Sequence, residues 1–485
     1  MAEADVERMR RPLRVENPWW AGGGPPEALA KPFRGGRFEA LKNSLDRPDI
    51  LALSGPRQVG KTTLMHQLVQ YLLEDRKVSP RRVLFHSFDA PGTAYTNREA
   101  LHGIIDFFVG PFQKAPLRHG GPSLFVFLDE VAKVEGWART LKGWYDLRYP
   151  VKFVVSDSSQ ALLWRGAAEF LVGRVLLEPI HPMGLADTGC LRGMDWKLSG
   201  SACAWAADFA AAIQRRSVKG TYTVFGRIES EVGEIDDRLD IELERYLLVD
   251  GFPALATEES LAVANARFRQ YFDLTVYKDL VRTFQIRNPK ALEQLAVLVA
   301  AGSAQRTNYE KLSQTLKVKI DTLRDYLDYL ESASLIATSE FYGRSRAVSL
   351  RRPKKLYLRN CGVRNALAGD LTEELLEDPA RLGHVVETVV AEHALRLSQR
   401  LTGHASLAYW QDDTGREVDI IIGPPLRPLP IEVKYQQTVG GSDLTPIRAF
   451  VEKYRTGLGL VVTREHLEVR GNVVLVPLKL FLLAT

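Results

Sequence analysis

The sequence predicts an α/β protein, with a parallel sheet in its first part, a helical middle region and a smaller α/β domain at its end. From Asp49 onward, short apolar runs alternate with longer amphipathic stretches, which is typical of a parallel sheet covered by helices. Helical periodicity then dominates residues 239–300, and strand-like runs return after residue 400. The expected segments are an irregular lead-in (1–40), an α/β core (41–185), an insertion or interdomain region (186–238), a helical region (239–300), two helices with a wing (301–360) and a C-terminal α/β domain (375–485).

Size and composition narrow the class of protein. The 485 residues exceed one ordinary domain, and 45% hydrophobic with 25% charged residues is typical of a globular protein. No apolar run approaches the roughly 18 residues of a membrane span, and the charged start, Met1 to Arg14, lacks an apolar signal core. Cys190, Cys203 and Cys361 have no CxxC spacing. We therefore expect a cytoplasmic protein without a membrane partner, whose net charge of +5 permits nucleic acid as a partner without requiring it.

The lead-in and the strands can be placed by their composition. Residues up to about Arg37 are rich in Gly and Pro, and we expect Trp19 and Trp20 to anchor this segment to the next domain. The predicted strands of the core are DILALSG, RRVLFHSF, LFVFLDE and VKFVVSDSS, and the predicted helix is TTLMHQLVQYLLED. Between Gly184 and Asp237 the periodicity is lost, which is the reason for expecting an insertion there.

A glycine-rich loop carries the first chemical signal. The segment GPRQVGKTT fits G-x-x-x-x-G-K-[ST] and lies between a predicted strand and a predicted helix, as a phosphate-binding loop requires. Its glycines let backbone N–H groups surround phosphates, Lys61 adds a positive charge, and the Thr62 hydroxyl is suited to Mg²⁺. The residues expected to contact ATP are Gly55, Pro56, Arg57, Gln58, Val59, Gly60, Lys61, Thr62 and Thr63. The alternative is a chance glycine turn before a helix.

An acidic strand end supplies the expected partner of this loop. In LFVFLDE, Asp129 follows a buried strand, at the edge where open α/β sheets bind ligands. Asp129 is expected to hold Mg²⁺ together with Thr62, and Glu130 to polarise the attacking water; otherwise both acids are ordinary surface residues. Ser156 is a candidate sensor of the γ-phosphate and Arg174 a candidate arginine finger, in cis or in trans. For each, a capping or ion-pairing role is the alternative.

These motifs resemble a known group. ENPWW, LSGPRQVGKTT, FLDEV followed by Trp137, and the Ser-rich strand end are similar to the prokaryotic AAA-type ATPases that carry a C-terminal domain of unknown function, known as AAA_14 and DUF4143. The resemblance implies an AAA-type ATPase core, a winged helix and a restriction-endonuclease-like end domain. This sequence departs from the family pattern at Asp157, where Gly is usual.

After the helical region, two short helices followed by a two-stranded wing describe a winged helix-turn-helix, here called the helix-turn-helix segment (301–360). Leucines at three- and four-residue steps form the expected core. The basic residues expected to be exposed are Lys317, Lys319, Arg344, Arg346, Arg351, Arg352, Lys354 and Lys355. Such residues can contact the phosphates of DNA or RNA. The alternatives are a solvated basic hairpin, or a winged helix that packs on the ATPase as a lid.

A second constellation of acids lies in the last segment. Glu387 is on a predicted helix, Asp419 on one strand, and Glu432 and Lys434 share one face of the next strand. Converging carboxylates suit Mg²⁺ or Mn²⁺, and a neighbouring lysine stabilises a phosphodiester's charge. The order resembles the PD-(D/E)xK nucleases without their leading Pro, so Glu387, Asp419 and Glu432 are predicted metal ligands, and Asp419, Glu432 and Lys434 catalytic residues. The alternatives are a degenerate nuclease fold or an ordinary charged sheet face; His384 is interpreted as a partly buried helical histidine rather than a ligand.

Together these features predict an ATP-binding and ATP-hydrolysing AAA-type enzyme that controls a metal-dependent nuclease domain acting on nucleic acid, in defence or mobile-element biology by analogy. The expected cofactors are ATP and Mg²⁺, with Mn²⁺ as an alternative at the nuclease site. The expected partner is DNA, with RNA as an alternative, and a homo-oligomer or a partner protein is left open. The competing hypothesis is a nucleotide-dependent switch that binds partner proteins and carries an inert nuclease-like domain.

Overall fold

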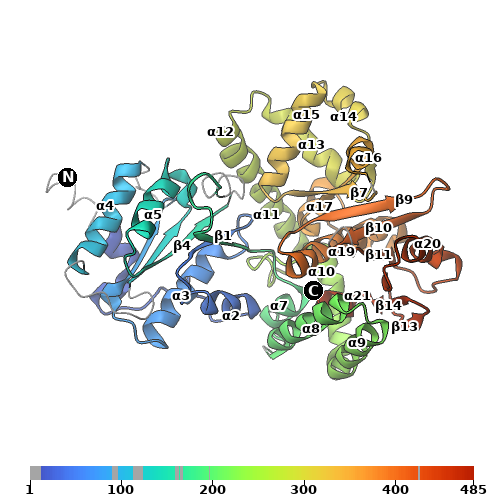
Figure 1. Ribbon diagram of the computed structural model, residues 1–485, viewed down its shortest axis with the longest axis horizontal. Coiled ribbons are helices and arrows are strands. Elements are labelled where there is room, and N and C mark those ends of the chain that lie inside the picture. Colours follow the sequence, from blue (N-terminus) through green and yellow to red (C-terminus); the bar gives the residue numbers. More distant parts are fainter. Residues whose placement is uncertain are drawn as a thin grey trace. The chain divides into compact units, whose positions relative to one another are not determined.

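The computed structural model describes residues 12–89, 97–112, 124–158, 163, 168–195, 197–343, 345–423 and 427–485. The chain folds into two compact units, one ending at His181 and one spanning Pro182–Thr485 (Figure 1). Among the described residues, no helix combines the length and the apolar character that crossing a membrane requires.

The first unit is built on a five-stranded sheet in the order β2-β3-β4-β1-β5, and every strand pair is parallel. The strands are β1 (Ile50–Ser54), β2 (Val83–Ser87), β3 (Leu124–Asp129), β4 (Val151–Asp157) and β5 (Val175–Pro179). All residues of β1, β3 and β4 are buried, because helices cover both faces of a parallel sheet. The predicted parallel sheet is confirmed.

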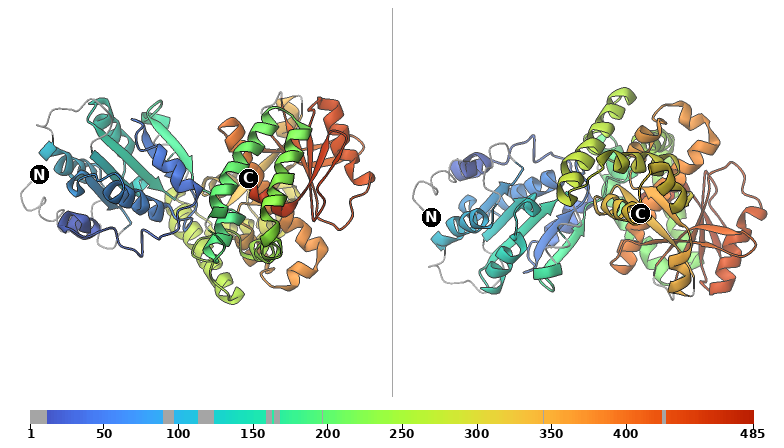
Figure 2. Two further views of the ribbon diagram at one scale, coloured as in Figure 1. Left: turned by 90° about the horizontal axis from the view of Figure 1, so that it is seen from below. Right: turned by 90° about the horizontal axis from the view of Figure 1, so that it is seen from above.

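Different helices cover the two faces of this sheet (Figure 2). The helices are α2 (Gly36–Asn43), α3 (Lys61–Glu74), α4 (Arg98–Val109) and α5 (Trp137–Asp146), with short 3-10 turns at Pro18–Ala21, Pro80–Arg82, Gly110–Phe112 and Val131–Lys133. Alternate strand residues such as Ile50 and Ala52 share a core with α4 and α5. Helix α3 packs against the sheet through other residues, among them Met65 and Leu68. The phosphate-loop helix therefore has one face of the sheet as its support.

The lead-in is anchored by side chains, as expected. The indole nitrogens of Trp19 and Trp20 both donate to the Val83 carbonyl oxygen, at 3.0 and 2.9 Å. The buried Asn17 side chain both donates to the Phe85 carbonyl, at 2.8 Å, and accepts from the Phe85 N–H, at 2.6 Å. Helix α2 starts inside the range that was expected to be irregular, so the lead-in ends earlier than residue 40.

The second unit contains one nine-stranded mixed sheet, in the order β13-β14-β12-β11-β10-β9-β7-β8-β6. The strands are β6 (Arg306–Thr307), β7 (Ile336–Phe341), β8 (Lys354–Leu358), β9 (Leu407–Gln411), β10 (Glu417–Ile422), β11 (Leu429–Lys434), β12 (Gly459–Thr463), β13 (Glu468–Arg470) and β14 (Val473–Pro477). A parallel β7–β9 pair joins the strands of the expected wing to those of the expected end domain. The two segments that the sequence separates therefore share one sheet.

Helices surround this sheet. They are α7 (Leu185–Leu191), α8 (Lys197–Gln214), α9 (Val218–Val232), α10 (Asp236–Val249), α11 (Leu261–Asp273), the π-helical η6 (Leu274–Leu280), α12 (Val281–Phe284), α13 (Pro289–Ala301), α14 (Tyr309–Leu316), α15 (Ile320–Ser332), α16 (Arg346–Arg351), α17 (Cys361–Ala368), α18 (Glu374–Glu377), α19 (Pro379–Thr402), α20 (Thr445–Tyr454) and α21 (Leu478–Leu483). The expected insertion forms α7, α8 and α9. Helix α8 is rich in Ala, Gly and Ser, and small residues hide helical periodicity because they do not mark a buried face.

The helix-turn-helix segment has the expected element order with one difference. Helices α14 and α15 precede the antiparallel β7–β8 pair, but a short helix, α16, replaces the expected basic turn. Lys317, Lys319, Arg351 and Arg352 are exposed as expected. Arg344 and the side chain of Arg346 lie outside the described part of the structure. The prediction for Lys355 is wrong, because its side chain is only 3% exposed.

Candidate functional site

The phosphate-binding loop follows the carboxyl end of β1, and its glycines have steric reasons. A Cβ on Gly55 would lie 2.2 Å from the Ile180 carbonyl oxygen, so only glycine fits beside the end of β5. Gly60 has a φ of +95° at the start of α3, and Gln58 also has a positive φ, of 62°. A loop with this backbone directly before the N-terminus of α3 is the arrangement that an anion site requires.

Lys61 is buried within the loop. Its Nζ donates to the carbonyl oxygens of Gly55 and Pro56, at 2.8 and 3.0 Å. Burial lowers the pKa of Lys61, with Glu130 the strongest opposing charge. The ammonium therefore has neutral acceptors in direct contact, and its charge is available to a phosphate.

Asp129 joins the loop to the neighbouring strands. The Thr62 hydroxyl donates to Asp129 Oδ2 at 2.9 Å, and the Ser156 hydroxyl donates to Asp129 Oδ1. A threonine hydroxyl and a carboxylate side by side are hard oxygen donors that suit Mg²⁺. The donor set therefore fits Mg-ATP, with the loop and Lys61 toward the phosphates and with Thr62 and Asp129 toward the metal.

Glu130 follows in a left-handed conformation, with a φ of 55°. Its N–H donates to the Ser156 hydroxyl at 3.3 Å, and Ser158 donates to Glu130 Oε2 at 3.0 Å. Non-glycine residues in this conformation cost free energy and are frequent at functional sites. Ser156 thus contacts both acids, and it is placed to hold them in position.

Asp157, the residue that departs from the family pattern, has a local role. Its Oδ2 accepts the N–H of Ala132 at 2.9 Å, which fixes the turn after Glu130. Neither this bond nor that of Ser158 was predicted. Polar residues clustered after a buried strand were the only signal for them.

Arg174 is not where a finger in cis would lie. It precedes β5, and its carbonyl accepts the N–H of Ile50 at the start of β1. The phosphate loop follows the other end of β1. Parallel strands of five residues separate the two edges by roughly 16 Å, and the Arg174 side chain pairs instead with Asp146 at 2.8 Å. The cis interpretation is wrong, and a role in trans stays a prediction.

The C-terminal acids also converge, but around a lysine. Lys355 Nζ lies 3.1 Å from Glu387 Oε1, 2.7 Å from Glu417 Oε1 and 3.4 Å from Asp419 Oδ1. The Tyr357 hydroxyl donates to Glu387 at 2.8 Å. Burial disfavours the ammonium, but Tyr357 and the carboxylates outweigh it and raise the pKa of Lys355 well above its usual value. The same burial, with the charge of Asp419, raises the pKa of Glu387 to about 7.

Glu432 and Lys434 form a second pair beside this cluster. Lys434 Nζ contacts Glu432 Oε1 at 2.6 Å, and Asp419 Oδ2 accepts the N–H of Val433 at 3.0 Å. Glu432 is 2% exposed, and its Oε2 has no hydrogen-bond partner among the described residues. Burial, followed by the charge of Asp419, raises the pKa of Glu432 well above its usual value. The predicted neighbours Asp419, Glu432 and Lys434 are therefore together.

A divalent metal does not fit this arrangement. The ammonium of Lys355 occupies the point on which Glu387 and Asp419 converge. Within the described ranges, no group of three or more His, Cys, Asp or Glu side chains is placed to hold a metal ion. His384 is half-buried on α19, and burial lowers its pKa, in agreement with a helical histidine rather than a ligand.

Sequence reasoning missed Lys355, Tyr357 and Glu417 as members of this cluster. A weak signal was present, because Lys355 and Tyr357 are two apart on one strand, as are Glu417 and Asp419 on another. Which face of each strand is buried could not be known before the wing and the end domain were seen to share a sheet.

The parallel sheet, the phosphate-binding loop and the acidic end of β3 define a P-loop ATPase fold. Residues 47–188 match the AAA domain family AAA_14, and residues 382–481 match the domain of unknown function DUF4143. Residues 240–374 match a further domain of unknown function, DUF8612. Along the chain, the AAA_14 match is thus followed by the DUF8612 match and then by the DUF4143 match.

Relatives span most of the chain. The uncharacterized protein MJ1637 of Methanocaldococcus jannaschii is 26% identical over 442 residues, covering 90% of this chain and 85% of that protein. The uncharacterized protein Rv2008c of Mycobacterium tuberculosis is 24% identical over 440 residues, covering 90% and 82%. Among solved structures, the Walker-type ATPase PABY2304 of Pyrococcus abyssi is similar, with 17% identity, a TM-score of 0.39, and coverage of 68% of this chain and 94% of that one. The Aeropyrum pernix ORC2 protein in its ADP form has 15% identity, a TM-score of 0.32, and coverage of 71% and 97%.

Proposed function

We propose that the protein hydrolyses ATP in its first unit and acts on nucleic acid with its second. One observation carries the first part: Lys61, Thr62 and Asp129 meet at the carboxyl edge of the sheet, with Glu130 beside them. The AAA_14 match over the same residues supports it.

The residues of this site have separate tasks. The loop N–H groups and Lys61 hold the phosphates, and Thr62 and Asp129 would hold Mg²⁺, which neutralises phosphate charge when bound. Glu130 takes a proton from, or orients, the attacking water. Ser156 keeps the two acids apart and aligned, through one hydrogen bond to each residue.

Nucleotide binding by Lys61→Ala tests the assignment of the loop. Loss of a charge-assisted bond to phosphate should weaken ATP binding on the order of 100-fold, measured by titration calorimetry. Lys142→Ala is the matched control, because Lys142 is a more exposed lysine of the same unit and pairs with Asp146. Equal ATP affinity in the Lys61→Ala and wild-type proteins would refute the site.

The action on nucleic acid is supported by the exposed cations Lys317, Lys319, Arg351 and Arg352 near α15 and the β7–β8 pair. If Arg351 and Arg352 contact duplex phosphates, Arg351→Ala with Arg352→Ala should make the log–log salt dependence of binding shallower, by roughly 0.9 for each phosphate that is no longer neutralised. An unchanged salt dependence would leave the lid or protein-contact role for this hairpin.

Metal-dependent cleavage is the second candidate function. It is favoured by the adjacency of Asp419, Glu432 and Lys434 and by the unpartnered Glu432 Oε2. It requires Lys355 to leave the carboxylates first. Plasmid cleavage by the wild-type protein with Mn²⁺ and ATP, lost in Asp419→Ala, would establish it. Absence of cleavage in the wild type and in Lys355→Met would favour the inert domain of the switch hypothesis.

A further inference from the structure

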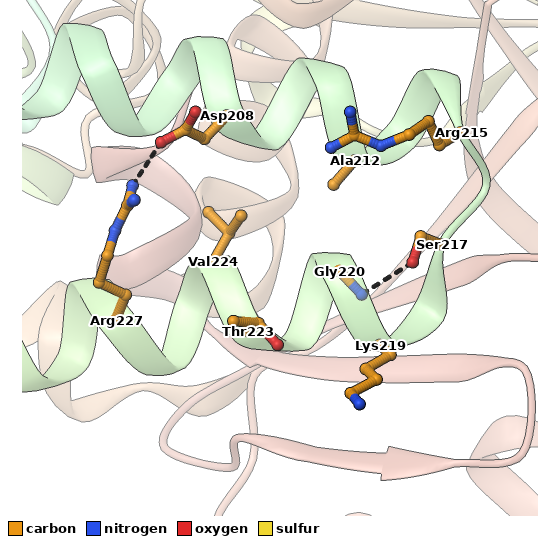
Figure 3. A pocket seen from close by; sticks show the side chains of 9 residues that line it. All are labelled: Asp208, Ala212, Arg215, Ser217, Lys219, Gly220, Thr223, Val224 and Arg227. Carbon is orange, nitrogen blue, oxygen red and sulfur yellow. Dashed lines mark hydrogen bonds and ion pairs between the residues drawn. The ribbon is translucent and has the colours of Figure 1, made fainter.

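Cations gather around the turn between α8 and α9 in the second unit. A hollow of about 460 Å³ lies at this turn, and its lining residues include Arg215, directly after α8, and Lys219 and Arg227 on α9 (Figure 3). Arg227 is neutralised by Asp208 at 2.6 Å. Arg215 and Lys219 have no ion pair with a carboxylate among the described residues.

Arg216, between them in sequence, faces another arginine. Its NH2 donates to the backbone carbonyl of Arg427, and its NH1 is buried without a hydrogen-bond partner in the described part of the chain. Burial, followed by the charge of Arg427, lowers the pKa of Arg216. Arg216 and Arg427 are thus in contact, and neither has an ion pair with a carboxylate among the described residues.

A second hollow, of about 630 Å³, adjoins this pair. It is lined by Arg448 and Arg455 of α20, by Arg470 of β13 and by Gly457. A Cβ on Gly457 would lie 3.8 Å from Arg216 Cβ, which places the hollow next to the arginine pair. Arg470 is neutralised by Glu468, whereas Arg448 and Arg455 have no ion pair among the described residues.

These residues form one surface with an excess of positive charge. The cations without an ion pair in the described ranges, here called the arginine surface, are Arg215, Arg216, Lys219, Arg427, Arg448 and Arg455. Glu452 is the one acidic residue that lines the second hollow within the described residues. Like charges brought together repel, and the arrangement is stabilised when an anion binds between them.

We propose that the arginine surface binds the phosphate backbone of a nucleic acid. A single small anion would need only Arg216 and Arg427. Cations on the α8–α9 turn, ahead of β11 and along α20 instead match a polymer with repeating negative charges. Arginine forks suit phosphate oxygens better than lysine does. The inference rests on the nucleic-acid part of the proposed function, and it adds a contact surface beyond the helix-turn-helix segment.

A triple variant with a charge-matched control tests the arginine surface. Arg215→Gln, Arg448→Gln and Arg455→Gln together remove exposed cations without changing the half-buried Arg216. The control combines Arg267→Gln, Arg282→Gln and Arg287→Gln, which are exposed residues elsewhere in the unit. Binding of a mixed-sequence duplex and a single strand is followed by fluorescence anisotropy over a salt series. The slope of log affinity against log salt should fall by roughly 0.9 for each duplex phosphate that the variant no longer neutralises, and it should remain as in the wild type for the control.

The outcomes separate the surface from the function. If the wild type binds nucleic acid and the triple variant keeps its slope, the arginine surface is wrong and the proposed function stands on the wing. If the slope falls as much in the control as in the triple variant, net charge alone explains binding, and the assignment of the arginine surface is again wrong. If the wild type binds neither duplex nor single strand at low salt, the nucleic-acid function itself fails.

Discussion

Two buried lysines, Lys61 in the first unit and Lys355 in the second, are near carboxylates but are held in opposite ways. Lys61 donates to two backbone carbonyls, while Asp129 is hydrogen-bonded to Thr62 and Ser156. Lys355 contacts three carboxylates directly. Accordingly, the pKa of Lys61 is lowered and that of Lys355 is raised.

The difference shows how the same residue types give different sites. A buried ammonium with neutral acceptors is under-compensated, so a phosphate that approaches it gains a strong interaction. A buried ammonium among carboxylates is already compensated, and removing one member leaves uncompensated charge. The first arrangement is built for a ligand, whereas the second holds β8, α19 and β10 together.

Loss of the Glu130 carboxylate should have the largest effect on the ligand site. Glu130→Gln should slow ATP hydrolysis by about 10²- to 10⁴-fold while ATP affinity stays near the wild-type value, because general-base catalysis contributes that much and the phosphate contacts survive. Phosphate release and calorimetric affinity are the measurements. Hydrolysis at the wild-type rate would show that another residue prepares the water.

Replacement of Lys355 tests the compensated site. Lys355→Met should lower the free energy of unfolding by about 3–5 kcal/mol, because three carboxylates lose their buried cation. Mn²⁺ should then raise the melting temperature of this variant but not of the wild type, since the vacated position becomes available to a cation. Lys354→Met is the control, because Lys354 is partly exposed and pairs with Glu340. A metal-induced stabilisation of the wild type would contradict our interpretation.

The phosphate site could be predicted from sequence because its parts are local. The loop from Gly55 to Thr63 is one segment, and Asp129 with Glu130 ends one buried strand, so strand-end geometry brings them together. Strand-end geometry also placed Ser156 near this site, and β4, which carries Ser156, lies between β3 and β1.

The lysine cluster could not be predicted in full because it depends on long-range pairing. Lys355 reaches Asp419 only because β7 pairs with both β8 and β9, which puts the wing hairpin in the end-domain sheet. The sequence pattern YGRSRAVSLRRPKKLYL predicts a basic wing with exposed cations, and nothing local separates the buried Lys355 from the partly exposed Lys354. The interpretation of Arg174 as a finger in cis also depended on tertiary structure, because the parallel pairing of β1 with β5 puts Arg174 at the edge of the sheet away from the phosphate loop.

The pH dependence of stability should differ in sign between the two units. Glu387 has a folded-state pKa of about 7 against an ordinary 4.5, so its contribution is fully present below pH 4.5 and is lost as pH rises through 7. At about 1.4 kcal/mol per pKa unit, the loss approaches about 3 kcal/mol. Glu387→Gln should remove most of this pH-dependent loss of stability, as measured by urea unfolding at pH 5 and pH 8.

His66 in the first unit gives the opposite sign. Burial lowers its pKa from 6.5 to about 4, and neither ring nitrogen has a hydrogen-bond partner among the described residues. Its contribution is therefore present above pH 6.5 and is lost as pH falls through 4. His66→Leu should reduce the loss of unfolding free energy that the first unit shows as pH falls. If Glu387→Gln and His66→Leu change the pH dependence of both units equally, neither group controls the pH dependence of its own unit.

The smallest effect is expected at Arg174, which the structure places away from the phosphate loop of its own chain. Arg174 lies at the amino edge of the strands and pairs with Asp146, so Arg174→Ala should change the rate of ATP hydrolysis less than about twofold in a dilute, monomeric sample. An arginine finger contributes about 10³-fold or more, so the two cases are well separated. Hydrolysis should be measured over a range of protein concentrations. A rate per molecule that rises with concentration in the wild type and not in Arg174→Ala would show that a second copy supplies this arginine in trans. A large loss of hydrolysis rate in Arg174→Ala at all concentrations would mean that Arg174 acts within its own chain. That result would contradict its position at the amino edge of β1 and β5.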